Sequence, residues 1–151
     1  MLPKKKIIKM ADHLSSEILI KTIEKAPLNQ LIKLYQQADW WESSWDSHSE
    51  FLNDIVKDSA VFVGAFSKGE LIGMGRALSD LASDAYIQDL TVLKEFRGKG
   101  IGKKIVLYLI EQLKKNGVDW IGIVAGPGTS LFYRKLGFKV LYGHVPLLYR
   151  G

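Results

Sequence analysis

The residues best suited to chemistry lie in one glycine-rich run, residues 97–103 with the sequence RGKGIGK, which opens an apolar, helix-periodic stretch. Backbone N–H groups in the first turn of a helix have no partner and lie at the positive end of the helix dipole, so they attract phosphate. Glycines let the backbone approach a phosphate closely, and Lys99 and Lys103 add positive charge. The run therefore predicts a binding site for a di- or polyphosphate.

Two well-known phosphate loops do not fit these residues. The P-loop pattern G-x-x-x-x-G-K-(S/T) fails because Lys103 stands five residues after Gly98 and no Gly-Lys-Ser or Gly-Lys-Thr occurs in the chain. The dinucleotide pattern G-x-G-x-x-G fails because Lys103 takes the place of the third glycine. A simple tight turn is the alternative, but three alternating glycines at a helix start with basic neighbours favour anion binding.

Other kinds of chemistry have little to build on. The chain has no cysteine, which excludes disulfides, thiolate zinc sites, iron–sulfur clusters and a cysteine nucleophile. His13, His48 and His144 stand far apart in the sequence, so we expect no metal site. No apolar run reaches the ~18–20 residues that span a bilayer, and no apolar stretch of the signal-peptide kind follows the first lysines. We therefore expect a cytoplasmic protein with no membrane partner.

Length and charge indicate one domain behind a short basic tail. The 151 residues suit a single core, and 47% hydrophobic with 25% charged residues is typical of a globular protein. The net charge is +5, but the first ten residues hold four lysines and no acid, which leaves +1 for the rest. We expect a basic tail over residues 1–16 and a single domain over residues 17–151. Because nucleic acid needs a basic stripe on the folded body, we expect no nucleic-acid partner.

A central strand must position the glycine run. Residues 84–93 carry apolar side chains on both parities, which is typical of a strand buried on both faces, and residues 101–116 have the period of a helix. The remaining patterns predict strands over 17–24, 59–66, 71–79, 118–125, 138–143 and 145–150, and helices over 28–39, 49–57 and 129–136. This order predicts an α+β domain with a mixed sheet.

Two motifs resemble those of the GNAT acetyltransferases. Arg97, Gly100 and Gly102 fit the signature (R/Q)-x-x-G-x-(G/A), and residues 131–138, LFYRKLGF, are similar to the F-Y-x-x-L-G-F segment that follows it in that family. The resemblance extends over residues 17–150. It implies a twisted, mostly antiparallel sheet of six to seven strands flanked by four helices.

The resemblance implies that the glycine run binds acetyl-CoA. The pyrophosphate would lie on the backbone amides of the run, and the peptide-like pantetheine arm would pair with the preceding strand as an extra strand. The residues assigned in this way to the cofactor are Leu90, Thr91, Val92, Arg97, Gly98, Lys99, Gly100, Ile101, Gly102, Lys103 and Tyr133. One departure is Gly126, which stands where many members carry an asparagine that touches the cofactor. We expect no side-chain contact from that position.

The activity implied is direct acetyl transfer to an amine in a ternary complex, because the chain has no cysteine for a covalent intermediate. Tyr133 corresponds to the family tyrosine that would protonate the CoA thiolate; the alternative is that it only packs beside Phe132. The base is expected to be Asp89 or a water beside Gln88, unless Asp89 merely accepts structural hydrogen bonds. Asp80 is a further candidate.

The expected acceptor is the primary amine of a small molecule. Trp40, Trp41 and Trp45 stand among acidic residues in an aperiodic segment, and aromatic faces with carboxylates suit an organic cation; core packing is the alternative. Segments within residues 38–92 resemble, more weakly, the branch that includes plant plastid N-acetyltransferases of arylalkylamines such as serotonin. A protein or peptide amine as acceptor, or a CoA-binding regulatory module without catalysis, are the alternatives. Analogy with the family makes a homodimer the expected assembly.

Overall fold

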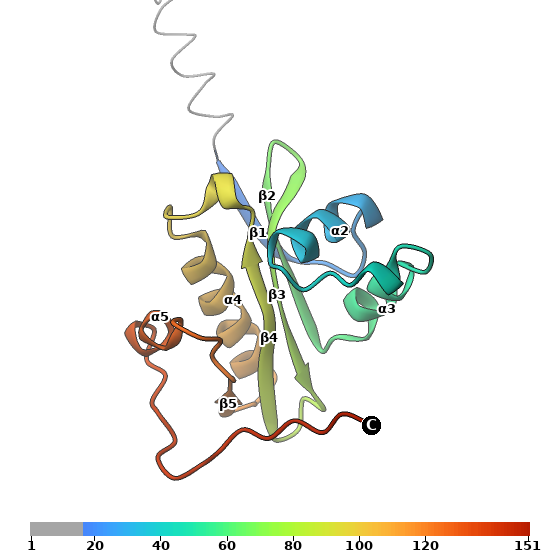
Figure 1. Cartoon of the computed structure of the whole chain (residues 1–151). Coiled ribbons are helices and arrows are strands. Elements are labelled where there is room, and N and C mark those ends of the chain that lie inside the picture. The colour runs from blue at the N-terminus through green and yellow to red at the C-terminus, as the bar shows by residue number, and fades with distance from the viewer. Residues whose placement is uncertain (1–16) are drawn as a thin grey trace, which may run out of the picture.

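The chain forms one sheet with helices packed against both of its faces (Figure 1). The computed structural model describes residues 17–151. Within this range the strands are β1 (Ile18–Thr22), β2 (Val61–Ser67), β3 (Glu70–Ser79), β4 (Asp84–Val92) and β5 (Trp120–Gly122). The helices are α2 (Leu28–Gln37), α3 (Phe51–Asp58), α4 (Ile101–Lys115) and α5 (Ser130–Lys135), and short 3₁₀ helices cover Ser43–Trp45 and Lys94–Phe96.

The strands lie in the sheet in chain order, from β1 to β5. Neighbours from β1 to β4 pair antiparallel, whereas β5 pairs with β4 in parallel. A parallel neighbour requires a crossover connection, which α4 supplies because it runs back along the sheet between β4 and β5. The α+β class, the mixed sheet and the four helices predicted from the sequence are confirmed.

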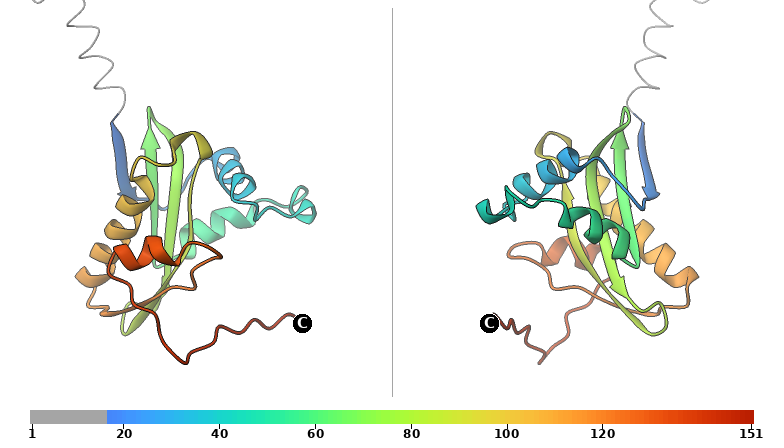
Figure 2. Two further views of the ribbon diagram at one scale, coloured as in Figure 1. Left: turned by 60° about the vertical axis from the view of Figure 1, so that its left-hand side comes forward. Right: turned by 90° about the vertical axis from the view of Figure 1, so that its right-hand side faces the viewer.

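Helices α2 and α3 cover one face of the sheet and α4 covers the other (Figure 2). On the first face, Leu31 and Leu34 of α2 are completely buried. On the second face, α4 buries the side chains that recur every four residues in the sequence: Ile101, Ile105, Leu109 and Leu113. The amphipathic period therefore predicted the inward face of α4 correctly.

Two glycines of β3 let α4 approach the sheet closely. A Cβ built on Gly75 would lie 2.8 Å from Ile105 Cγ2 and 3.1 Å from Leu109 Cδ1, and one built on Gly73 would lie 3.2 Å from Ile105 Cδ1. Ile105 and Leu109 are completely buried, so neither side chain has room to move aside. The missing side chains at positions 73 and 75 therefore set the packing distance between α4 and β3.

The prediction of six to seven strands is wrong for the described residues. The segments 138–143 and 145–150, predicted as strands, have no regular structure, and the fifth strand covers only Trp120–Gly122 of the predicted 118–125. The sheet of residues 17–151 consequently has five strands.

The reason for this error is that an alternating pattern does not supply a partner strand. A strand is stable only where it can pair and bury a face, and β5 offers an outer edge of three residues. After α5 the chain instead turns at Gly143, where the His144 N–H donates to the Leu141 carbonyl at 3.2 Å. The following Leu147 and Tyr149 are each 91% exposed. Their apolar character predicted burial that this segment does not have.

Gly75→Ala is expected to lower the free energy of unfolding by about 1–3 kcal/mol, because the added methyl group overpacks the contact with Ile105 and Leu109. Denaturant titration followed by circular dichroism checks this. The matched control is Gly126→Ala, whose methyl group would meet only Thr129 Oγ1, at 3.9 Å. Equal stability of the two variants would contradict the packing argument.

Candidate functional site

One edge of β4 is open beside the glycine run. β5 pairs with β4 only at Asp84, Ala85 and Tyr86. From residue 87 onward no strand within residues 17–151 lies along that side of β4, so its backbone N–H and C=O groups there have no ladder partner. An extended, peptide-like ligand can pair with such an edge.

The open edge of β4 and the glycine run line one cavity of about 580 Å³. Nine of the eleven residues that the sequence assigns to a cofactor line it: Leu90, Thr91, Val92, Arg97, Gly98, Gly100, Ile101, Gly102 and Lys103. Lys99 and Tyr133 are not part of the lining. Phe96 and Phe132 complete it, and sequence reasoning did not assign either to the site. The only feature of the sequence that could have identified them is that each is adjacent to an assigned residue.

The glycine run presents unpaired backbone amides to the cavity. Gly98 and Gly100 both have a φ of 76°, a left-handed conformation that costs other residues about 1–2 kcal/mol. α4 begins at Ile101 without a side-chain cap, and the Lys104 N–H donates to the Gly100 carbonyl at 3.1 Å. The N–H groups of the first three helical residues are therefore the free donors of this turn. Together with Lys103, which lines the cavity, these donors are suited to an anion.

The run is held in place from the end of α2. The Gln37 side-chain oxygen accepts the Lys94 N–H at 2.8 Å, and the Gln37 carbonyl accepts Arg97 Nη2 at 3.5 Å. Arg97 Nε donates to the Val92 carbonyl at 2.7 Å, which closes the turn between strand and helix. Sequence reasoning did not identify Gln37, since its only signal was its place in the last turn of a helix.

Asp89 lies on the face of β4 next to α2, where two donors already engage it. Its Oδ2 atom accepts Arg76 Nε at 2.6 Å and the Tyr35 hydroxyl at 2.8 Å. Burial, followed by the negative charge of Asp89, raises the pKa of Tyr35 well above its ordinary value, so the phenol keeps its proton and remains a donor. These two hydrogen bonds are those expected if Asp89 has a structural role. Its role as a base stays a prediction.

The other acidic candidate, Asp80, caps the loop between β3 and β4. Its Oδ1 atom accepts the N–H groups of Ala82 and Ser83 at 2.9 and 3.2 Å. These backbone hydrogen bonds lower the pKa of the Asp80 carboxyl. The carboxylate is thus employed in holding a loop, and Asp80 does not line the cavity.

Tyr133 is buried among aromatic rings next to the cavity wall. Its ring lies edge-to-face on Phe132 at 4.9 Å and on Phe138 at 5.8 Å between centroids. Burial raises the pKa of Tyr133, so its hydroxyl stays protonated further into the alkaline range. The structure therefore shows the packing of Tyr133 beside Phe132 that the sequence offered as the alternative to a catalytic role. Its role as a proton donor stays a prediction.

The three candidate tryptophans divide into two environments. Trp40 is 39% exposed and lies edge-to-face on Tyr35, with 5.9 Å between ring centroids. Trp41 and Trp45 pack on each other at 5.5 Å, and the Trp41 Nε1–H donates to Asp46 at 2.8 Å. Trp40 is therefore the one of the three that lies next to the cluster around Asp89, whereas Trp45 also packs on Phe51 of α3 and Trp41 on the core.

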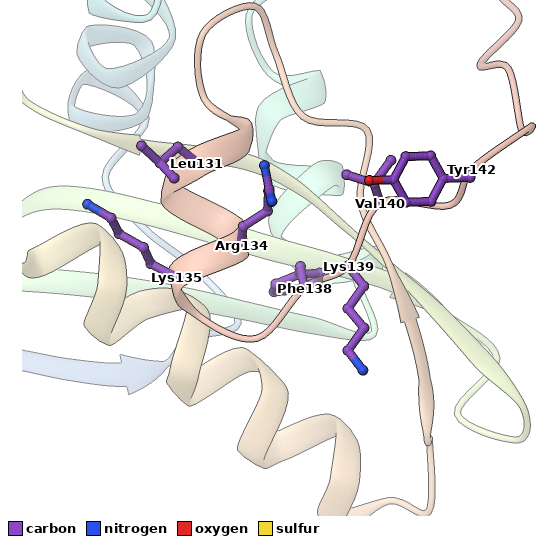
Figure 3. A pocket seen from close by; sticks show the side chains of 7 residues that line it. All are labelled: Leu131, Arg134, Lys135, Phe138, Lys139, Val140 and Tyr142. Atoms are coloured by element: carbon purple, nitrogen blue, oxygen red, sulfur yellow. The ribbon is translucent and has the colours of Figure 1, made fainter.

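A larger hollow of about 690 Å³ lies beside α5 and includes Phe138, whose ring packs on Tyr133. Figure 3 shows Leu131, Arg134 and Lys135 of α5 facing it, together with side chains of the segment that follows. It contains no residue that the sequence assigns to chemistry, so its size does not mark it as the functional site.

The family relationship follows from the sequence over most of the domain. Residues 22–138 match the Acetyltransferase (GNAT) family. The chain belongs to this family. The resemblance that rested on Arg97, Gly100 and the Phe132-Tyr133 motif is thereby confirmed.

Three proteins illustrate the similarity of this GNAT chain to known ones. Uncharacterized N-acetyltransferase ycf52 of Pyropia yezoensis is 34% identical over 87 residues, which cover 55% of this chain and 50% of that protein. GCN5-related N-acetyltransferase 2, chloroplastic, of Arabidopsis thaliana is 29% identical over 137 residues, covering 91% of this chain and 45% of that protein. The chain spans about half the length of these relatives. The structure of AAC(6')-Iy in complex with the bisubstrate analog CoA-S-monomethyl-acetylneamine has the same fold, with a TM-score of 0.70 and 18% identity over 90% of this chain and 99% of that one.

Residues 17–151 contain neither a metal-binding cluster nor a membrane-spanning helix. No group of three or more His, Asp or Glu side chains there is arranged to hold a metal ion. No helix in that part of the chain is both long and apolar enough to cross a membrane.

Gln37→Ala is expected to lower the free energy of unfolding by about 1 kcal/mol and to speed hydrogen exchange at the Lys94 amide, because that N–H loses its acceptor. Exchange measured by NMR checks this. The matched control is Gln36→Ala, since the Gln36 side chain on the same helical turn is exposed. If the two variants exchange alike at Lys94, the assigned role of Gln37 is wrong.

Proposed function

We propose that this chain is an N-acetyltransferase that moves the acetyl group of acetyl-CoA to the primary amine of a small molecule, by direct attack in a ternary complex. The observation that carries the proposal is the cavity in which the free amides at the start of α4 meet the unpaired edge of β4. Membership of the GNAT family and the CoA analog bound to the AAC(6')-Iy neighbour support acetyl-CoA as the donor.

The two halves of acetyl-CoA match the two halves of the cavity. The pyrophosphate suits the free amides at the start of α4 and the Lys103 side chain, because these carry positive charge into the same cavity. The pantetheine arm contains amide groups, which suit the open backbone of Leu90, Thr91 and Val92. Gly126 offers no side chain to this arm, so the backbone of β4 carries that contact.

The chemistry needs one proton removed and one supplied. The neutral amine attacks the thioester carbonyl carbon; a C–N bond forms, the C–S bond breaks and the CoA thiolate leaves with the electron pair. A proton leaves the new ammonium for a base, and the thiolate takes a proton from a donor. We assign the donor to Tyr133, because it corresponds to the family tyrosine and its ring packs on Phe132, which lines the cavity.

The charge of the segment from residue 39 to residue 58 favours a cationic acceptor. It holds six acidic side chains and one lysine, and all six acids are exposed. The exposed ring of Trp40 lies within this segment and attracts cations through its π face. An amine approaching as its ammonium ion is drawn to this side of the molecule and must lose a proton before it attacks. Small aromatic or aliphatic amines meet these requirements.

Compartment and assembly stay predictions. The name of the Arabidopsis relative places that protein in the chloroplast, which makes a plastid the competing location to the cytoplasm. Imaging of a tagged chain in its host decides between the two. Light scattering with in-line chromatography decides whether the chain forms the expected homodimer.

Gly100→Ala is expected to weaken acetyl-CoA binding about tenfold or more, because an alanine at a φ of 76° displaces the first turn of α4 and misaims its amides. Isothermal calorimetry measures the Kd. Gly69→Ala is the matched control: Gly69 has a φ of 82° and open space around it, but it lies in the β2–β3 hairpin. Both variants should lose similar stability. Should the wild-type chain give no heat with acetyl-CoA, the proposed function fails.

Tyr133→Phe is expected to lower kcat about 10²-fold while the Kd for acetyl-CoA stays within about twofold, because only proton donation is lost. Release of the CoA thiol with a panel of alkylamines, arylalkylamines and lysine peptides measures turnover and the acceptor class. Tyr142→Phe is the control, as Tyr142 is 87% exposed. Turnover with the lysine peptides alone would indicate a protein acceptor in place of a small molecule. Binding of acetyl-CoA without turnover of any amine would indicate a regulatory module.

A further inference from the structure

β4 carries one extra residue where it passes β3. Met74 pairs with Thr91 and Arg76 pairs with Gln88, so two residues of β4 face the single residue between Met74 and Arg76. Asp89 is the first of the two and has a φ of 52°. This arrangement is a β-bulge, which bends its strand and re-aims the side chains around it.

The bulge decides which face of the sheet each following residue takes. Gln88 and Asp89 are consecutive, yet both reach Arg76, at 3.4 Å and 2.6 Å. Leu90 then points to the opposite face, because its Cδ1 atom lies 3.4 Å from a Cβ built on Gly75, beside α4. Without the extra residue, every side chain and backbone group after it would turn to the other side. The part of β4 that lines the cavity therefore takes its orientation from the bulge.

The conformation of the bulge is strained, and the contacts of Asp89 hold it. An aspartate adopts a positive φ more readily than most residues, although at a cost. Its Oδ2 atom is fixed from two directions, by Arg76 of β3 and by Tyr35 of α2. The side chains of Arg76 and Asp89 are only 15% and 22% exposed, so water competes weakly for this ion pair.

We propose that Asp89 is a positioning residue: Arg76 and Tyr35 hold its carboxylate, and through it they fix the bulge that presents the β4 edge to the acetyl donor. This inference rests on the proposed function, because it takes acetyl-CoA as the ligand of that edge. In this role Asp89 touches neither substrate. Its loss affects the binding of acetyl-CoA rather than the removal of a proton from the amine.

The test compares Asp89→Ala with Asp89→Asn. Alanine removes both hydrogen bonds, so the Kd and KM for acetyl-CoA should rise about tenfold, with kcat at saturation within about twofold. Asparagine keeps a side-chain oxygen for Tyr35 and tolerates the positive φ, so it should restore binding to within about threefold of wild type. The dependence of kcat on pH should be unchanged in both. Asp84→Asn, an exposed carboxylate at the start of the same strand, is the control.

A second variant keeps the test decisive if Asp89→Ala does not fold. Tyr35→Phe removes one donor to Asp89 and leaves the charge, so it should raise the Kd in the same direction by a smaller factor. A loss of about 10²-fold or more in kcat for Asp89→Asn, with the acid limb of its pH profile removed and the Kd unchanged, would establish Asp89 as the base and overturn the proposal. Unchanged Kd and kcat in Asp89→Ala would overturn it as well.

The failure of this inference can be told apart from the failure of the proposed function. Hydrogen exchange at the Leu93 amide, which donates to the Ile72 carbonyl of β3 at 2.8 Å, reports on the strand pairing after the bulge without any ligand. Asp89→Ala should speed that exchange even if the wild-type chain binds no acetyl-CoA, whereas unchanged exchange in Asp89→Ala, with acetyl-CoA bound normally by wild type, contradicts the positioning role alone.

Discussion

Two residues of β4 share the space opposite one glycine of β3, and this mismatch constrains everything around the cavity. Gly75 has no side chain, so Ile105 and Leu109 of α4 rest directly on β3 at that point. This close approach of α4 to β3 also places the first turn of α4 near the end of β4. The bulge in β4, the missing side chain at Gly75 and the position of the free amides are therefore structurally coupled. We expect a change in one of them to displace the other two.

Two regions of the molecule carry opposite charge, and the proposed substrates give a physical reason for it. Under the proposed function one substrate brings phosphates and the other brings an ammonium group, so each is attracted to a different flank. Lysines and free amides gather at the start of α4, whereas exposed acids gather between residues 39 and 58. The separation of the two kinds of charge matters, because the potentials of intermixed positive and negative charges would cancel at the distances over which substrates are attracted.

Sequence patterns were sufficient for features that depend on local chemistry. The period of α4 predicted the inward face of the helix, because helix amphipathicity is a pattern among neighbouring residues. Nine residues of the cavity wall were assigned through the resemblance to the GNAT family, which rests partly on the glycine run. Features that depend on distant partners were not predictable. Gln37 reaches Lys94 across 57 residues of chain, and the segment after α5 alternates like a strand yet finds no edge to pair with.

The last turn of α2 joins parts of the site that the sheet alone would leave independent. Tyr35 donates to Asp89 at the bulge, and two residues later Gln37 accepts the amide of Lys94 beside the glycine run. Trp40 follows directly and packs on Tyr35. Because a helix end moves as a rigid unit, a displacement of α2 shifts the β4 edge, the anion-binding turn and the exposed tryptophan together. Under the proposed function, α2 therefore links the surroundings of the acetyl donor with the tryptophan expected to face the acceptor.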